Sequence, residues 1–432
     1  MVGLPEWEDG PQGDASRHYG LLWWNNGDGA LGRVPRDAFW AWGLYDSLIV
    51  VVPSLDLVVV RGGENGRQWP RGKDEGHYAV LEPFLDPIVA GLTPGPGGRD
   101  RSSSTSSGAA PYPPSPKIVG VDWAPTSTIV RKAEGGDNWP LTWGDDDRLY
   151  TAYGDGRGFQ PFVEKKLSLG LCRVTGGPED FQGVNLRSQT AERIGQGAEG
   201  EKASGILMVE GVLHLWVRNA GNARLGWSRD HGATWEWADW KFTTSFGCPT
   251  FLDFGKNSAD APDDFVYVYS PDADGAYEAV DRMVLARAPK QRLHERSAYE
   301  FFVRRDRRGR AEWSTNIDDR GAVFENPGRC YRGGVTYNAA LERYLWCQVL
   351  PESKDPRGPR FEGGFGVYDA PQPWGPWTTA YFTEHWDVGP GETSSFPSKW
   401  MSPDGKTVHL VFSGDDSFSV RRAVLRIADD GR

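Results

Sequence analysis

Five stretches of the chain share one plan, an entry strand, a turn and a second strand, and this repetition predicts a mainly β fold. Their turns lie about 54 to 76 residues apart, at Asp146, Glu210, Asp264, Ala340 and Asp404. The 432 residues include 55 Gly and 31 Pro, which favours many turns over long helices. A run of Gly, Ser and Pro separates the repeats from a different N-terminal segment. Together these observations predict a five-bladed β-propeller, or one of six or seven blades, preceded by a small α/β fragment.

The N-terminal segment, residues 1–92, carries a hairpin signal followed by a helical one. β-Branched runs at 46–52 and 57–61 flank a turn that contains Pro and Asp, which predicts a hairpin. From His77 to Leu92 the apolar residues recur at helical spacing. We therefore expect a hairpin followed by an amphipathic helix.

Aromatic stretches precede this hairpin at Tyr19–Asn25 and Phe39–Gly43. With them, residues 15–92 resemble the C-terminal end of the β-lactamase-related serine hydrolases. That family uses a Ser-x-x-Lys motif and a triplet that contains Lys or His. No lysine of this chain has a serine three residues before it, and residues 40–43, where the triplet would fall, include no basic residue. The resemblance therefore implies a catalytically incomplete remnant.

Residues 93–116 hold almost nothing that a core could bury, and they predict a flexible linker. The chain thus divides into residues 1–92, this linker and a propeller at 117–432. A strand within Ile118–Val130 would supply the outer edge of the last blade and close the ring.

Two motifs in the repeats point to a family. Ser228–Trp235 matches the Asp-box, Ser-x-Asp-x-Gly-x-Thr-Trp, and Ala370–Trp377 contains a Trp-Gly-Pro-Trp turn of the kind found between outer blade strands. Through these motifs residues 117–430 resemble the sialidase-like and arabinanase-like carbohydrate-active propellers. The Asp-box itself is expected to cap a tight turn through local hydrogen bonds and to lie away from the chemistry.

In a propeller the innermost strands line one central funnel, so residues at the five entry strands should converge. The candidate catalytic residues are Asp137, Glu201, Glu392 and Tyr331. The candidate substrate-binding residues are Asn138, Trp139, Lys202, Arg329, Arg332 and Lys399 from the entry strands, and Asp155 from the loop that follows the second strand of the first repeat. Glycoside hydrolysis needs one protonated and one ionised carboxyl group. We predict Asp137 with Glu201 for this pair, with Glu392 as the substitute for Glu201. The structural alternative is that these acids only neutralise Lys202 or Arg332.

Four cations of the entry strands would form a wall that suits a substrate carboxylate, because arginine binds carboxylates in a bidentate manner. They are Lys202, Arg329, Arg332 and Lys399. An acidic, uronate-containing oligo- or polysaccharide is the predicted partner, and hydrolysis is the predicted reaction. One alternative is a polysaccharide lyase, with Tyr331 taking the C5 proton in a β-elimination. Another is a propeller that binds glycans without cleaving them.

Charge and hydropathy limit the other partners. The net charge of −11 argues against a protein that grips nucleic acid or an anionic membrane. Apolar runs such as Leu48–Val52 are far too short to span a membrane. No secretion signal is visible, so we expect a cytoplasmic protein as the sequence is written, or an exported one if residues precede it. No cofactor is expected, although the acidic turns Asp145–Asp147 and Asp415–Asp416 offer oxygen ligands for Ca²⁺. The oligomeric state is left open.

Overall fold

The structure is a computed structural model, and its chain forms two compact units, Met1–Ala109 and Ala110–Arg432. It describes residues 19–20, 23–27, 31–43, 47–55, 57–62, 81, 83–86, 88–89, 110–352, 355 and 357–428. Most of the predicted linker, residues 93–109, lies outside this set. No helix within the described residues is long and apolar enough to cross a membrane.

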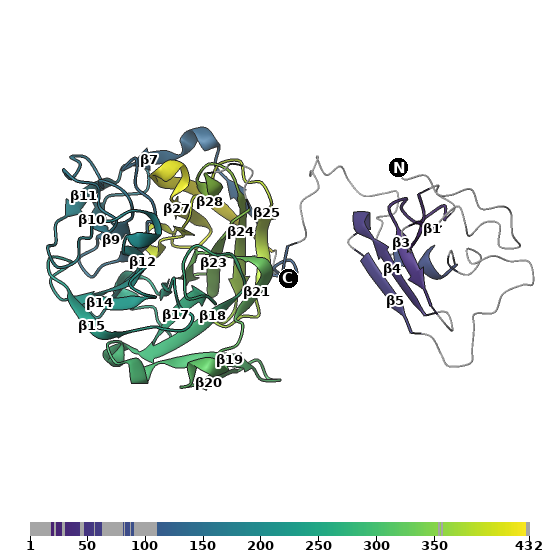
Figure 1. The fold of residues 1–432 in the computed structure, drawn as a ribbon. Coiled ribbons are helices and arrows are strands. Elements are labelled where there is room, and N and C mark those ends of the chain that lie inside the picture. The colour runs from purple at the N-terminus through teal and green to yellow at the C-terminus, as the bar shows by residue number, and fades with distance from the viewer. Residues whose placement is uncertain are drawn as a thin grey trace, which may run out of the picture. The chain divides into compact units, whose positions relative to one another are not determined.

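The N-terminal unit contains one antiparallel sheet in chain order (Figure 1). Its strands are β1 (Tyr19–Gly20), β2 (Trp23–Asn25), β3 (Phe39–Trp42), β4 (Leu48–Val52) and β5 (Leu57–Arg61). β4 and β5 form the expected hairpin, with Leu48 opposite Arg61. The described residues of 81–89 are helical, as expected, and Leu81 and Leu85 pack with Val50 of the sheet.

The larger unit contains five successive antiparallel meanders over the described part of residues 110–428 (Figure 1), so the prediction of a mainly β fold is confirmed. The first meander comprises β8 (Leu141–Trp143), β9 (Leu149–Tyr153), β10 (Gly170–Thr175) and β11 (Gln182–Leu186). The second comprises β12 (Lys202–Val209), β13 (Val212–Arg218), β14 (Arg224–Ser228) and β15 (Glu236–Lys241). The third comprises β16 (Thr250–Asp253), β17 (Phe265–Pro271), β18 (Val280–Pro289), β19 (Glu300–Arg305) and β20 (Ala311–Ser314). The fourth comprises β22 (Gly333–Asn338), β23 (Arg343–Leu350), β24 (Gly364–Ala370) and β25 (Thr378–Thr383). The fifth comprises β26 (Ser394–Ser395), β27 (Thr407–Phe412), β28 (Phe418–Ile427) and β6 (Ile118–Trp123).

Short 3-10 helices lie in the connections between strands. They are η3 (Pro53–Leu55), η4 (Thr126–Thr128), η5 (Gly197–Glu199), η6 (Lys256–Ser258), η7 (Lys290–Arg292), η8 (Arg296–Ala298), η9 (Ile317–Asp319), η10 (Gly358–Arg360), η11 (Ser398–Trp400) and η12 (Gly414–Asp416).

The innermost strands of the meanders meet around one axis. A cavity of about 30 Å³ is lined by residues of β8, β12, β16, β22 and β26. β16 and β22 pair in parallel, with Leu252 opposite Val335. The backbone N–H of Trp139, just before β8, donates to Thr393 Oγ1, just before β26, at 3.2 Å. The first and fifth meanders are therefore neighbours, and the ring is closed.

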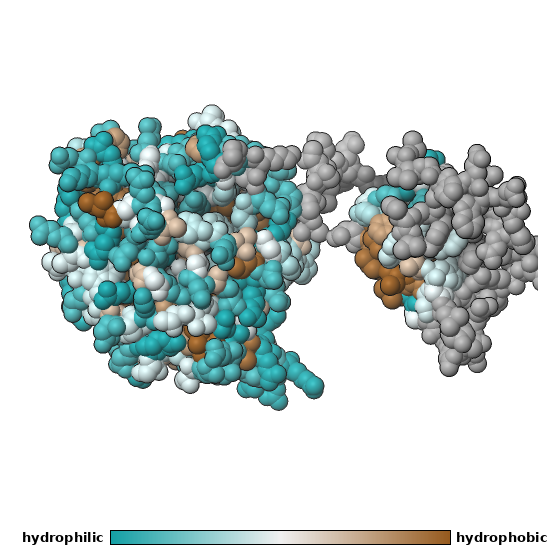
Figure 2. Space-filling view, in the orientation of Figure 1, coloured by the Kyte–Doolittle hydropathy of each residue, from teal (hydrophilic) through white to brown (hydrophobic). Residues whose placement is uncertain are grey.

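Apolar side chains fill the spaces between neighbouring meanders. Ile206 and Leu213 of the second meander, for example, pack with Tyr150 of the first. Phe418 of the fifth packs with Trp139 beside the first. The outward-facing surface is largely hydrophilic in the view of Figure 2. The apolar residues thus hold the meanders to one another, and polar side chains are left at the ends of the strands.

The last meander takes its outer strand from the start of the larger unit. β6 pairs antiparallel with β28, with Ile118 opposite Ile427, and β7 (Val130–Lys132) pairs with the beginning of β28. The prediction that a strand within 118–130 supplies this edge is confirmed.

One part of the predicted linker is not a linker. Residues 110–116 belong to the larger unit, where Ser115 N–H donates to Thr379 O and Thr379 N–H donates to Pro113 O, both at 2.8 Å. The Tyr112 ring packs on Phe324 at a centroid distance of 4.8 Å. A composition rich in Pro does not exclude pairing at the free edge of β25, because that edge supplies the hydrogen-bonding partners.

Candidate active site

Polar and charged side chains from all five meanders gather at one end of the ring. They lie where innermost strands begin, where second strands end, or in the loops between second and third strands. We call the following residues the funnel cluster: Asp137, Asp155, Lys202, Arg218, Tyr277, Arg332, Arg360, Glu392 and Asp416. In an up-and-down meander, the start of the first strand, the end of the second strand and the loop between the second and third strands all lie at the same end of the sheet. This explains why these residues converge.

Asp137 is held by its own backbone against the end of β9. Its N–H donates to Gly154 O at 2.9 Å, and Gly154 N–H donates back to Asp137 O at 2.7 Å. A Cβ at position 154 would lie 2.4 Å from Asp137 Oδ1, so only glycine leaves room for this carboxylate. Asn138 follows in the left-handed region, with a φ of 51°, which asparagine tolerates better than most residues. The Asp137 side chain is thereby fixed at the floor of the funnel with 6% of its surface exposed.

Arg332 joins this carboxylate to a second one. Asn138 Nδ2 donates to Asp137 Oδ1 at 3.0 Å, and Asn138 Oδ1 accepts from Arg332 Nη1 at 3.2 Å. The same Arg332 nitrogen forms a short ion pair with Glu392 Oε2. Two further Arg332 nitrogens donate to Ala276 O, at 2.9 and 2.6 Å. Because Arg332 is buried and bonded on every side, it is a fixed counter-ion for Glu392.

Arg360 lies over both carboxylates and is more loosely held. Its guanidinium nitrogens are 3.7 Å from Asp137 Oδ2, 3.5 Å from Glu392 Oε1 and 3.4 Å from Asp416 Oδ2. These contacts are longer than a good charge-assisted hydrogen bond, and 35% of the Arg360 side chain is exposed. Arg360 is therefore the counter-ion on the solvent side of the pair.

The opposite side of the cluster comes from the second meander. Lys202 Nζ, at the start of β12, is 2.6 Å from Asp155 Oδ1. Arg218, at the end of β13, is fully buried, and its guanidinium lies 5.1 Å from the centre of the Tyr277 ring. The Arg332 guanidinium lies 5.1 Å from the same ring. The cluster thus brings together four carboxylates and four cations among the described residues.

The two central carboxyl groups have opposite pKa shifts. Burial, and then the nearby Glu392 carboxylate, raises the pKa of Asp137 from its ordinary 3.8 to about 6. Burial would also raise the pKa of Glu392, but Arg332, Arg218 and Arg360 together outweigh it and hold that pKa at about 2, below the ordinary 4.5. Asp137 is thus set to hold a proton in mildly acidic solution, and Glu392 to stay ionised.

Several residues predicted from the sequence lie in this cluster or against it. Asp137, Asn138, Arg332 and Glu392 are joined by the contacts above, and Lys202 pairs with Asp155 on the other side of the cluster. Tyr331 lies beside Arg332, with the guanidinium 4.8 Å from its ring centre. Burial raises the pKa of Tyr331 to about 12, which makes it a poor proton acceptor near neutral pH.

Other predicted residues lie elsewhere. Glu201 Oε2 accepts from Arg193 Nε at 2.7 Å, outside the cluster. Because successive residues of a strand face opposite sides, the inward Lys202 turns its neighbour Glu201 outward. Trp139 is buried in the apolar core between the fifth and first meanders, so its ring offers no platform for a sugar.

Two members of the predicted cationic wall are also displaced. Arg329 lies on β21 (Phe324–Cys330), an additional strand that pairs with β18, and its guanidinium binds Glu384. Lys399 Nζ is 2.9 Å from Asp147 Oδ1, in the turn between β8 and β9 and therefore at the other end of β8 from Asp137. The cations that surround the two carboxyl groups are instead Lys202, Arg218, Arg332 and Arg360.

Arg218, Tyr277, Arg360 and Asp416 were not predicted as site residues. Arg218 is the last residue of β13, and Asp416 follows β27 as Asp155 follows β9. Considering the end of the second strand in every repeat, as was done for Asp155, would have found both. Tyr277 and Arg360 come from long loops without a repeated pattern, and the sequence carries no comparable signal for them.

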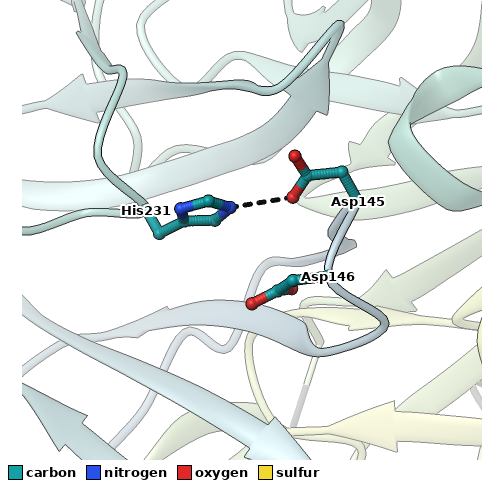
Figure 3. Close-up of side chains that lie close together, drawn as sticks. All are labelled: Asp145, Asp146 and His231. Atoms are coloured by element: carbon teal, nitrogen blue, oxygen red, sulfur yellow. Dashed lines mark hydrogen bonds and ion pairs between the residues drawn. The ribbon is translucent and has the colours of Figure 1, made fainter.

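The acidic turn of the first meander lies at the opposite end from the cluster. Asp145 Oδ1 is 2.8 Å from Nε2 of His231, which belongs to the Asp-box, and Asp146 lies beside them (Figure 3). One ligand atom from each lies within 4.8 Å of the others. Arg148 Nη1, however, donates to Asp146 Oδ2 at 2.8 Å, so the charge of the Asp146 carboxylate is already neutralised by an arginine of the protein.

The Asp-box has the structural role expected of it. Asp230 Oδ1 accepts from Ser228 Oγ and from Thr234 N–H, both at 2.8 Å, and Oδ2 accepts from Thr234 Oγ1 at 2.6 Å. The Trp235 indole is buried between the first two meanders. This turn is stabilised by its own side chains and takes no part in the funnel cluster.

No protein-family model matches the sequence, and no curated protein matches it. Among solved structures, the GH43_1 enzyme from Xanthomonas citri is 14% identical with a TM-score of 0.39, over 71% of this chain and 93% of that one. RS223 β-xylosidase is 11% identical with a TM-score of 0.39, over 69% and 94%. The Hadza microbial sialidase Hz136 is 11% identical with a TM-score of 0.37, over 68% and 53%. These sequence identities and TM-scores are too low to indicate what this chain does. Its chemistry is therefore inferred from the side chains of the funnel cluster alone.

Proposed function

We propose that the larger unit is a five-bladed β-propeller that hydrolyses a glycosidic bond with Asp137 and Glu392 as its two carboxyl groups. The observation that carries the proposal is the opposite pKa shift of these two groups, which share Arg360 as a neighbour. Pairs of carboxyl groups held in different protonation states are typical of acid–base catalysis on glycosides.

Asp137 is the acid in this proposal. With its pKa raised to about 6 it still holds a proton in mildly acidic solution, and it donates that proton to the glycosidic oxygen as the bond breaks. Glu392 is the ionised partner, acting as the base that activates water or as the nucleophile. Arg332 keeps Glu392 charged and oriented. Glu392 therefore takes the role that was first predicted for Glu201.

An acidic glycan is the proposed substrate. The four cations of the cluster surround the carboxyl pair, and guanidinium groups recognise carboxylates with two parallel hydrogen bonds. A uronate carboxylate that entered the funnel would meet Arg360 first, because this is the most exposed of the four. A neutral sugar offers these cations no compensating charge.

The proposal is tested by incubating the full chain with uronate-containing and neutral polysaccharides and analysing the products by mass spectrometry. We expect products that have gained one water from an acidic glycan. Asp137→Asn and Glu392→Gln should each lower turnover about 10²- to 10⁴-fold. Glu201→Gln is the matched control and should leave turnover unchanged, because Glu201 pairs with Arg193 outside the cluster.

Three results would contradict the proposal. Full activity of Asp137→Asn would remove the acid from the mechanism. Products with a new double bond would establish a lyase. Saturable glycan binding without any product would leave a binding protein.

A further inference from the structure

Arg218 is a buried cation without a hydrogen-bonding partner. None of its three guanidinium nitrogens has an acceptor among the described residues, and its relative exposure is 0%. Leaving a charged donor group buried and unbonded is costly, and native structures rarely keep one without a reason. The other buried guanidinium of the cluster, Arg332, is by contrast saturated by Glu392, Asn138 and Ala276.

The strand register makes this arrangement more unusual. Lys202 of β12 lies directly opposite Arg218 of β13, and residues directly opposite in an antiparallel pair point to the same face. Two like charges in such a pair repel each other. Asp155 neutralises Lys202 at 2.6 Å, so the charge that lacks a paired carboxylate is that of Arg218.

Arg218 also lies close to the catalytic groups of the proposed function. Its charge lowers the pKa of Asp137, and for Glu392 it is the second strongest cation after Arg332. Its contact on the outer side is the Tyr277 ring, which is 42% exposed and covers the guanidinium. Tyr277 is held by its hydroxyl group, which donates to Gly197 O and accepts from Asn219 Nδ2, each at 3.0 Å.

We propose that Arg218 is the specificity-determining residue of the site and binds the carboxylate of an acidic sugar, which displaces the Tyr277 ring as it enters. This inference rests on the proposed function and adds the residue that reads the substrate charge. The planar fork of Arg218 has free donors for both oxygens of one carboxylate, whereas Arg332 and Lys202 are already paired.

The experiment measures binding of free monosaccharides to the full-length protein, so it does not depend on turnover. The probes are sodium glucuronate and sodium galacturonate, each compared with its uncharged methyl ester by titration calorimetry. We expect wild-type protein to prefer at least one uronate over its ester by about 10- to 100-fold, as a charge-assisted hydrogen-bonded pair provides. Arg218→Met should abolish this preference.

Thermal stability supplies a second readout. Arg218 has no hydrogen bond to another described residue that could be lost, so Arg218→Met should lower the melting temperature less than a variant that removes a fully bonded buried arginine. The matched control is Arg421→Met. Arg421 is equally buried, but it binds both oxygens of Asp387 and donates to Ala124 O. This control should lower the melting temperature and keep the uronate preference.

The possible results separate the two proposals. A uronate preference that survives Arg218→Met, the absence of any preference in wild type, or a melting temperature for Arg218→Met at or below that of Arg421→Met would overturn the role of Arg218. A preference that depends on Arg218 in a protein that cleaves no glycan would support the carboxylate site and reject the hydrolase. Cleavage of acidic glycans with an unchanged preference in Arg218→Met would do the reverse.

Discussion

Replacing Arg332 by Met should destabilise the larger unit by about 3 kcal/mol at pH 7, through the loss of the counter-ion of Glu392. The difference between the ordinary Glu pKa of 4.5 and the pKa of about 2 in the folded protein corresponds to about 3 kcal/mol of stabilisation, to which Arg332 contributes more than Arg218 or Arg360. An independent expectation agrees, because removing one partner of a buried ion pair costs about 3 to 5 kcal/mol. The Glu392 side chain is only 13% exposed, so solvent screens the pair weakly.

The pH dependence of this loss follows from the direction of the shift. A carboxyl group whose folded pKa is depressed contributes stability above its unfolded pKa and loses it as the pH falls through the folded pKa. The advantage of wild type over Arg332→Met should therefore be full at pH 7 and become smaller as the pH falls from about 4.5 toward about 2. In the variant only Arg218 and Arg360 are left to oppose the effect of burial, so the pKa of Glu392 should be higher than in wild type.

Urea unfolding followed by tryptophan fluorescence at pH 7 and pH 4 measures both effects. Arg304→Met is the control for loss of an arginine: Arg304 and Glu312 form an exposed pair, whose loss should change stability little. The double variant Arg332→Met with Glu392→Gln should recover part of the loss, because no charge is then left unpaired. A loss below about 1 kcal/mol at pH 7, or equal losses at both pH values, would refute the assignment of Arg332 as the counter-ion of Glu392.

Three further predictions follow from the same geometry. The rate of glycan hydrolysis should fall as the pH rises through about 6, because Asp137 then loses the proton it must donate; a pH–rate profile that is flat from 5 to 8 would contradict this. Asp230→Ala should cost about 1 to 2 kcal/mol in urea unfolding, by removing the three hydrogen bonds of the Asp-box, while turnover by the folded protein stays at the wild-type level. Lys399→Met and Arg329→Met should each retain the KM of wild type for an acidic glycan, because their cations pair with Asp147 and Glu384 away from the funnel; a several-fold rise in KM would place them at the substrate.

The repeated strands and the closing strand could be predicted because their signals are local. An apolar run, a turn and a second apolar run are read from consecutive residues, and the same plan returns in each meander. The pairing of residues 110–116 with β25 could not be predicted, because it depends on an edge supplied by a strand more than 260 residues away. The composition of a segment does not indicate which distant strand it will pair with.

The candidate site was predicted in part for a similar reason. Asp137 lies a few residues before β8 and Arg332 lies directly before β22, so their convergence follows from the repeat. Glu201 and Lys202 were both predicted as site residues, because the sequence does not show which of two neighbouring residues faces inward. Arg329 was placed in the wrong strand, because the sequence does not show that β21 pairs with β18 and stops before the fourth meander begins.

The closure of the ring by β6 sets the order in which the protein can be assembled during synthesis. Ile118 leaves the ribosome about 300 residues before its partner Ile427. At translation rates of roughly 5 to 20 residues per second, the unpaired strand waits about 15 to 60 s. Asp137 is likewise synthesised well before Glu392. Until the last meander emerges, the nascent chain therefore contains only part of the candidate site, together with an unpaired strand edge. Chaperone binding to ribosome-bound chains should therefore persist until about residue 427 is free, and then end abruptly.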